Sequence, residues 1–172
     1  ELAQAESQPL PEPDYSFGFE EKLELALRGG ARVVWSMFGT FTPEQIERIH
    51  AAGAEAWTTV TTPTEAIAAA RGGVDVLCVQ GPAAGGHRGT WELSATPDSR
   101  DLEELVADVR AAAPELPLIA AGGLRTAADV ANAMSWSGVA ACSCGSAFLL
   151  AAEAGTSDYN RQLLRRGGKT VS

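Results

Sequence analysis

Residues 117–123 read Pro-Leu-Ile-Ala-Ala-Gly-Gly, a run of apolar side chains that ends at two glycines. The run predicts a short, fully apolar strand, and the glycine pair predicts a turn directly after it. Residues 101–113 before this strand and residues 126–134 after it both have helical periodicity. A strand between two helices is the repeating unit of an α/β fold.

The same unit recurs from about residue 19 onward. The predicted helices cover residues 19–28, 42–53, 62–72, 101–113 and 126–134, and the predicted strands cover residues 33–38, 56–60, 74–79, 117–121 and 138–144. The segment 81–100 is too rich in Gly, Pro, Ser and Thr for regular structure, which is typical of a functional loop. Five strands in parallel order fit either an open doubly wound sheet or part of an eight-stranded barrel, and periodicity alone leaves both open.

The composition is that of one globular domain, with 172 residues, 45% hydrophobic and 20% charged. The formal net charge of -9 leaves no basic surface for nucleic acid. No apolar run reaches the roughly 18 to 20 residues of a membrane helix, and residues 1–14 lack the features of a signal peptide. We expect a cytoplasmic protein with a disordered or linker-like segment at 1–14 and a folded domain at 15–172.

The three cysteines, Cys78, Cys142 and Cys144, fall inside predicted strands and lack the spacing of metal ligands. They suit a reducing compartment, and we expect no metal site. Cys142 and Cys144 alternate along one strand, so their side chains should face the same side as small buried apolar groups. The pattern does not indicate an oligomeric state.

Ligands of parallel α/β folds bind at the carboxyl ends of the strands, which directs attention to the loops after residues 79, 121 and 144. The first loop places His87 and Arg88 among glycines that let a ligand approach the backbone closely. An imidazole can exchange a proton near neutral pH, or stabilise negative charge when protonated. The competing interpretation is a loop histidine held by neighbouring carbonyls. The other histidine, His50, lies near the end of a predicted helix, where the helix dipole explains it.

The second and third loops contain Gly122-Gly123 and Gly145-Ser146. Backbone N–H groups presented by consecutive strand ends form the usual phosphate cradle of TIM barrels. A strand-end glycine is most often only a turn, so each pair is a weak signal by itself.

Taken in order, these loops resemble the nitronate monooxygenase family, formerly called 2-nitropropane dioxygenases. The resemblance spans most of residues 15–164. It is strongest in Val79-Gln80-Gly81, in Ala84-Gly85-Gly86-His87-Arg88-Gly89, in residues 117–123, and in Gly145-Ser146 with Phe148-Leu149.

The resemblance implies an FMN-dependent TIM barrel that oxidises alkyl nitronates with O2 to carbonyl compounds and nitrite. Its active-site histidine falls on His87, which would meet a small anionic nitronate. The flavin-contacting positions implied by the resemblance are Gln80, Gly85, Gly122, Gly123, Ser143, Cys144, Gly145 and Ser146.

The sequence also departs from the family pattern. The last four of these positions usually read Gln-Met-Gly-Thr, and Ala83 stands where relatives often have an acidic residue. The family's first three strands, with a Pro-Met and an asparagine near the flavin, have no counterpart in residues 1–18. The visible strands would then be the fourth to eighth of the barrel. A complete barrel takes about 250 residues, so we expect a fragment, a chain completed by another, or a compact five-stranded descendant of a barrel.

Two other functions fit the same residues. FMN-dependent enoyl-acyl-carrier-protein reductases and NADH:quinone reductases share the Gly-Gly-His loop, and a non-catalytic remnant would keep the fold without flavin. Among the aromatic residues, Trp35 and Trp57 are expected in the core or the barrel interior, whereas Trp91 is a candidate wall of a substrate pocket.

Overall fold

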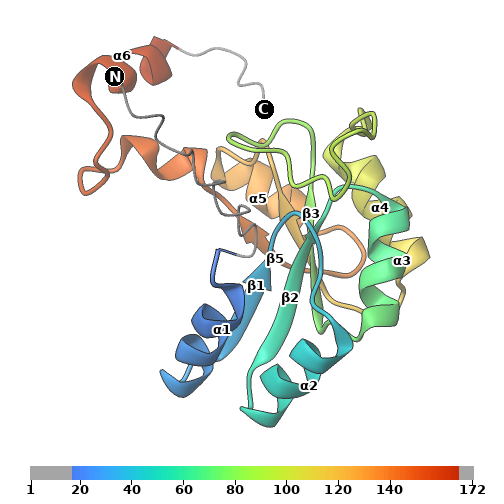
Figure 1. The fold of residues 1–172 in the computed structure, drawn as a ribbon. Coiled ribbons are helices and arrows are strands. Elements are labelled where there is room, and N and C mark those ends of the chain that lie inside the picture. Colours follow the sequence, from blue (N-terminus) through green and yellow to red (C-terminus); the bar gives the residue numbers. More distant parts are fainter. Residues whose placement is uncertain (1–16, 167–172) are drawn as a thin grey trace, which may run out of the picture.

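A computed structural model of the chain describes residues 17–166, and the predicted linker-like segment 1–14 lies outside this range. Helices and strands alternate along it (Figure 1). In order, the elements are α1 (Phe19–Arg28), β1 (Val33–Ser36), α2 (Pro43–Ala51), β2 (Glu55–Val60), α3 (Pro63–Gly72), β3 (Val76–Gln80), α4 (Leu102–Ala112), β4 (Leu118–Ala121), α5 (Ala127–Ala133), β5 (Val139–Ser143), the 3₁₀ helix η1 (Ser146–Leu150) and α6 (Asp158–Arg166).

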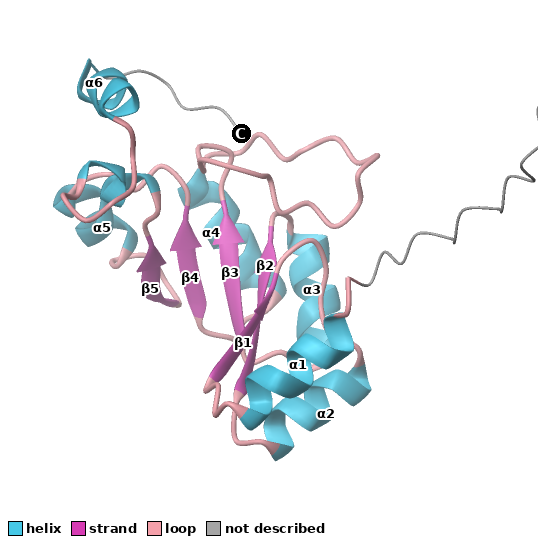
Figure 2. Cartoon of the chain, turned by 60° about the vertical axis from the view of Figure 1, so that its left-hand side comes forward, coloured by secondary structure: helices cyan, strands magenta, loops and turns pink. Residues whose placement is uncertain are grey.

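The five strands form one parallel sheet in the order β1-β2-β3-β4-β5. A doubly wound sheet reverses its strand order at a switch point, whereas consecutive strands of a TIM barrel pair in sequence. The sequential order therefore decides between the two predicted architectures in favour of a barrel segment. Figure 2 shows the sheet with β1 at one edge and β5 at the other.

The two faces of the sheet differ. The face toward the helices holds the larger core, in which Ile49, Leu77, Leu105 and Leu118 are fully buried. The opposite face, which is the inner side of the barrel segment, holds a smaller cluster of Val76, Cys78, Ile119 and Ala121, with Trp57 and Ala141 packed against it. Burial of the helix-facing side chains stabilises the layer by about 25 cal/mol per Å² of apolar surface.

Trp35 and Trp57 are register partners on neighbouring strands. Their rings meet edge to face with centroids 5.6 Å apart, and the Trp35 indole N–H donates to Thr59 Oγ1 at 3.0 Å. Both lie on the inner face, as predicted, but Trp35 at the sheet edge keeps 44% of its surface exposed.

Three of the helices begin at threonine capping residues. Thr42, Thr62 and Thr126 are N-caps whose side chains accept a hydrogen bond from the backbone N–H three residues later. Pro43 and Pro63 stand at the first helical position, where no N–H is needed. These caps fix where the chain leaves each strand-end loop.

Three strands end at a different residue from the predicted one. Strand β1 ends at Ser36, because Phe38 and Gly39 have φ values of 67° and 149° that no strand accommodates. Strand β3 extends to Gln80, one residue beyond the prediction. Strand β5 ends at Ser143, which leaves Cys144 just outside it. Cys142 and Cys144 face the same side as predicted, toward the helix-side core, but both are only partly buried.

Within residues 17–166, no helix is both long and apolar enough to cross a bilayer. The cysteines of the chain are all free thiols.

Candidate functional site

A cavity of about 650 Å³ opens at the carboxyl ends of β3, β4 and β5. It lies between the three loops that the sequence singled out. Its walls are made by Gln80, Ala83, Ala84, Gly85, Ala121, Gly122, Gly123, Leu124, Arg125, Ser143, Gly145, Ser146, Ala147, Leu150, Leu163, Leu164 and Arg166.

Seven of the eight predicted flavin-contacting residues line this cavity, with Cys144 as the exception. The Cys144 side chain packs toward the helix-side core, one residue beyond the end of β5. His87 is also absent from the walls and is exposed on the loop after β3. The sequence therefore located the cavity, while His87 lies outside its lining.

Gln80, the last residue of β3, is buried and holds the loop that contains His87. Its Nε2 donates to the His87 carbonyl at 3.1 Å, and its Oε1 accepts from the Gly89 N–H at 2.6 Å. The side-chain amide thus bridges two points of the loop. The predicted flavin contact of Gln80 would have to coexist with this role.

The His87 ring lies against a residue from another strand end. Its centroid is 6.3 Å from that of Phe38 at an interplanar angle of 87°, an edge-to-face arrangement. Phe38 follows β1 and adopts a left-handed backbone conformation. The loops after β1 and β3 thereby come together at the carboxyl edge of the sheet.

Two glycines let the loops after β3, β4 and β5 approach one another. A Cβ at Gly85 would stand 2.8 Å from Ser146 Oγ, and a Cβ at Gly122 would stand 3.0 Å from the Gly81 carbonyl oxygen. Gly122 also has a φ of 110°, which L side chains rarely adopt. Side chains at these positions would fill the space where the loops meet.

The segment 81–100 is irregular, as predicted, and Trp91 ties it to β2 and to the first turn of α3. The Trp91 backbone N–H donates to Glu65 Oε1 at 3.0 Å, and its indole N–H donates to the Thr59 carbonyl at 2.9 Å. Its ring packs against the helix-side core. Trp91 does not line the 650 Å³ cavity, and its two hydrogen bonds anchor the segment 81–100.

Arg88 points into the same loop segment. Its Nη2 donates to the Asp98 carbonyl at 3.0 Å, while its buried Nε has no hydrogen-bond partner within the described residues. Burial lowers the pKa of the guanidinium, opposed by the charges of Asp98 and Glu65. Arg100 pairs with the Asp98 carboxylate and holds its pKa below the ordinary value. Arg88 and Arg100 therefore shape the loop together.

The sequence did not single out Arg125, Arg166 or the leucines that complete the cavity wall. Arg125 stands two residues after the predicted Gly122-Gly123 pair, so position alone offered a signal for it. Leu124 lies beside Arg125 in the loop after β4, whereas Leu150 comes from η1, and Leu163, Leu164 and Arg166 come from α6.

The remaining candidate groups lie elsewhere. His50 pairs with Asp75 at 2.9 Å, a specific partner in addition to the predicted interaction with the helix dipole. Burial raises the pKa of the Cys78 thiol to about 12, and a hydrogen bond with Thr59 acts in the opposite direction. No cluster of His, Cys, Asp or Glu within residues 17–166 could hold a metal ion.

Comparison with known proteins relates the chain to one family. The model of the nitronate monooxygenase family matches residues 1–170. Nitronate monooxygenase of Pseudomonas aeruginosa is 34% identical over 128 residues, which cover 74% of this chain and 36% of that protein. The nitronate monooxygenase of Paraburkholderia phytofirmans is 34% identical over 138 residues, which cover 78% of this chain and 37% of that protein. The chain thus spans less than half the length of these relatives.

Solved structures give the same assignment. Nitroalkane oxidase from Streptomyces ansochromogenes superimposes with a TM-score of 0.81 at 35% identity, over 90% of this chain and 44% of that one. FabK from Thermotoga maritima superimposes with a TM-score of 0.71 at 20% identity, a likeness that shows the fold alone. The family model, the curated relatives and the fold agree, and the chain belongs to the nitronate monooxygenase family.

Proposed function

We propose that this chain forms the FMN-binding part of an enzyme that oxidises alkyl nitronates with O2 to carbonyl compounds and nitrite. The observation that supports the proposal most is the cavity itself. Seven predicted flavin-contacting residues, from the ends of three strands and the loops after them, line it together. Family membership supplies the reaction class.

The residues present fit FMN. The glycines at 85 and 122 let the loops meet, because a Cβ there would collide with Ser146 or with the Gly81 carbonyl. Gly145 lines the cavity with open space where a Cβ would stand, so a ligand can approach the backbone there. A volume of about 650 Å³ is within the range of small-molecule and cofactor sites. Gly122-Gly123 and Gly145-Ser146 would hold the phosphate, and Gln80 and Gly85 would lie nearer the ring.

The chemistry that bound FMN supplies is electron transfer between the nitronate and dioxygen. His87 would bind the nitro group of the anionic substrate or take up a proton at its imidazole. Gln80 would fix the position of the His87 backbone, and Phe38 would limit the orientation of the ring. The Trp91 anchor would hold the segment after His87 against the core.

The experiment compares two histidine variants of the full-length protein. The protein should purify yellow, and His87→Ala should lose at least about a hundredfold in nitronate turnover, in the range of general acid–base contributions, while it still holds FMN. His50→Ala is the matched control, because His50 pairs with Asp75 outside the cavity. A colourless protein that takes up no added FMN, or an unchanged rate for His87→Ala, would refute the proposal.

The same preparation separates the two other functions. Consumption of NADH without O2 would identify a reductase on this scaffold in place of a monooxygenase. Failure to bind FMN even at excess cofactor would identify a remnant that lacks the flavin.

A further inference from the structure

The loop after β1 brings two exposed apolar side chains to the residue that we assign to the substrate. Phe38 is 53% exposed and Met37 is 41% exposed. The Phe38 ring meets the His87 ring edge to face, with the centroids 6.3 Å apart. Met37 reaches the same segment, because a Cβ built at Gly89 would stand 3.3 Å from Met37 Cε. Apolar surface is therefore open beside the imidazole.

The backbone of Phe38 is held in a conformation that its side chain disfavours. Its φ of 67° is in the left-handed region, which suits glycine or asparagine and is an outlier for a bulky residue. The next carbonyl, that of Gly39, accepts a hydrogen bond from the buried Thr58 hydroxyl at 2.9 Å. Thr58 accepts in turn from the Ser36 hydroxyl at 2.7 Å. Strain that the surroundings maintain in this way is typical of ligand sites.

Packing of the core does not explain the aromatic side chain at this position. Phe38 belongs to neither hydrophobic cluster of the sheet. Phe41, from the same loop, is 4% exposed and is part of the helix-side core. The loop thus buries one phenylalanine and leaves the other half exposed beside His87.

We propose that Phe38 selects the substrate by its alkyl chain. With the nitro group of the substrate at His87, the carbon chain would lie along the exposed part of the Phe38 ring, with Met37 beside it. The preferred substrates are then nitronates with several apolar carbons, because each buried methylene group strengthens binding. The inference rests on the proposed nitronate oxidation and extends it, since it names the part of the substrate that the loop after β1 recognises.

The test measures O2 consumption by the full-length protein with the anions of nitroethane and 1-nitrobutane. The value of kcat/KM should be about tenfold higher for the butyl nitronate, because it has two more methylene groups to bury. In Phe38→Asn this ratio should fall to about threefold or less. The two substrates share one reacting group, so any change in FMN content or in the His87 ring affects both and cancels in the ratio.

Further variants separate the side chain from the backbone. Phe38→Gly also suits a φ of 67° and should lower the ratio as Phe38→Asn does, whereas Phe38→Leu keeps an apolar wall and should keep most of it. Phe17→Asn is the matched control. Phe17 is also left-handed, with a φ of 50°, and is 73% exposed, but it makes no ring contact within the described residues. Its substitution should leave the ratio unchanged.

The outcomes separate this inference from the proposed function. Similar kcat/KM values for both nitronates in the unaltered protein would overturn the role of Phe38 and leave the oxidation standing. The same holds for an unchanged ratio in Phe38→Asn and Phe38→Gly, or for an equal fall in Phe17→Asn. No turnover of either nitronate by protein that holds FMN would overturn both proposals.

Discussion

Gln80 donates a hydrogen bond from Nε2 to the backbone carbonyl of His87 at 3.1 Å, so the end of β3 is joined to the residue that we assign to the substrate. The same amide accepts the Gly89 N–H at 2.6 Å. Gln80 is 7% exposed, and its two hydrogen bonds are therefore shielded from water. The His87 loop owes its shape to a strand residue and not only to its own glycines.

Gln80→Leu should loosen this loop. The substitution keeps the volume but leaves the buried Gly89 N–H without an acceptor, at a cost of about 1–3 kcal/mol in the free energy of unfolding. Urea unfolding measures the cost, and hydrogen exchange of the Gly89 amide should accelerate. Gln162→Leu on the exposed side of α6 is the control. Unchanged exchange at Gly89 would show that other contacts hold the loop.

Glu65→Gln should release part of the 81–100 segment. The Glu65 carboxylate accepts from the Thr61 N–H at 2.5 Å, the Thr61 hydroxyl at 2.9 Å and the Trp91 N–H at 3.0 Å. An amide supplies one acceptor oxygen in place of two, so at least one of these bonds is lost. We expect about 1–3 kcal/mol of destabilisation and a red shift of Trp91 fluorescence. Glu103→Gln in the first turn of α4 should have no such effect.

Much of the fold could be predicted because its signals are local. Helix starts are marked by N-cap side chains, those of Thr42, Thr62 and Thr126. Glycine pairs mark the loops at strand ends. The order of the strands in the sheet has no such local signal. It depends on pairings such as Leu77 with Leu118, which are far apart in the sequence, and hydrophobic periodicity alone could not choose between a doubly wound sheet and a barrel segment.

The site divides in the same way. The glycines and serines that line the cavity were predicted from their motifs, whereas Arg125 and Arg166 were missed because an arginine on a loop or a helix end has no distinctive pattern. The anchoring of Trp91 was also missed. Its indole reaches the Thr59 carbonyl from 32 residues away, and only the folded chain reveals that partner.

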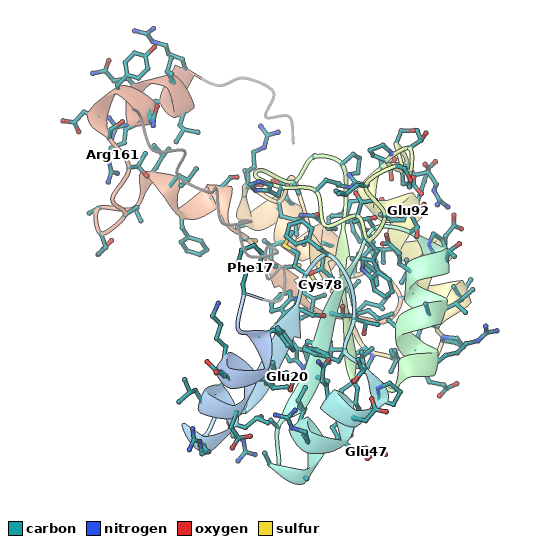
Figure 3. The ribbon with its side chains drawn as sticks, in the orientation of Figure 1. Phe17, Glu20, Glu47, Cys78, Glu92 and Arg161 are labelled. Carbon is teal, nitrogen blue, oxygen red and sulfur yellow. The ribbon has the colours of Figure 1, made fainter. Side chains whose placement is uncertain are left out.

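Raising the pH should destabilise the protein through Cys78, which lies at the centre of the sheet (Figure 3). Burial raises the pKa of its thiol from 9.0 to about 12 in the folded state. Below pH 9 both states keep the proton; between pH 9 and 12 the unfolded chain loses it and the folded chain does not. Stability should therefore fall with rising pH by up to roughly 1.4 kcal/mol per unit from this group.

The pH prediction is checked by urea unfolding at several pH values from 8 to 11. Cys78→Ala should remove the thiol's contribution to the slope of unfolding free energy against pH, although it lowers stability at every pH. Cys144→Ala retains Cys78 and should retain the slope of the unaltered protein. A slope that is identical in all three proteins would contradict the prediction.

Arg161→Gln should detach α6 from the segment before it. The Arg161 guanidinium donates to four carbonyls, those of Leu150, Ala151, Ala154 and Thr156, at 2.6 to 3.0 Å (Figure 3). Glutamine cannot span four acceptors, so cleavage by proteases between residues 151 and 157 should become several-fold faster. Arg165→Gln on the same helix makes no such contacts and serves as the control. Equal cleavage of both variants would show that the hydrogen bonds of Arg161 do not hold α6 to the segment before it.

Gly85→Ala should close the approach between the loops after β3 and β5. The added Cβ would stand 2.8 Å from Ser146 Oγ, which is closer than real side chains come, so one loop must shift. Because the clash involves a single hydroxyl oxygen, Ser146→Ala should relieve it, and the double variant should be more stable than Gly85→Ala by about 1 kcal/mol or more. Gly72→Ala, where a Cβ meets nothing within 4 Å, should be neutral. Thermal unfolding of the four proteins and FMN titration test this coupling, and strictly additive effects of the two substitutions would show that the loops do not meet.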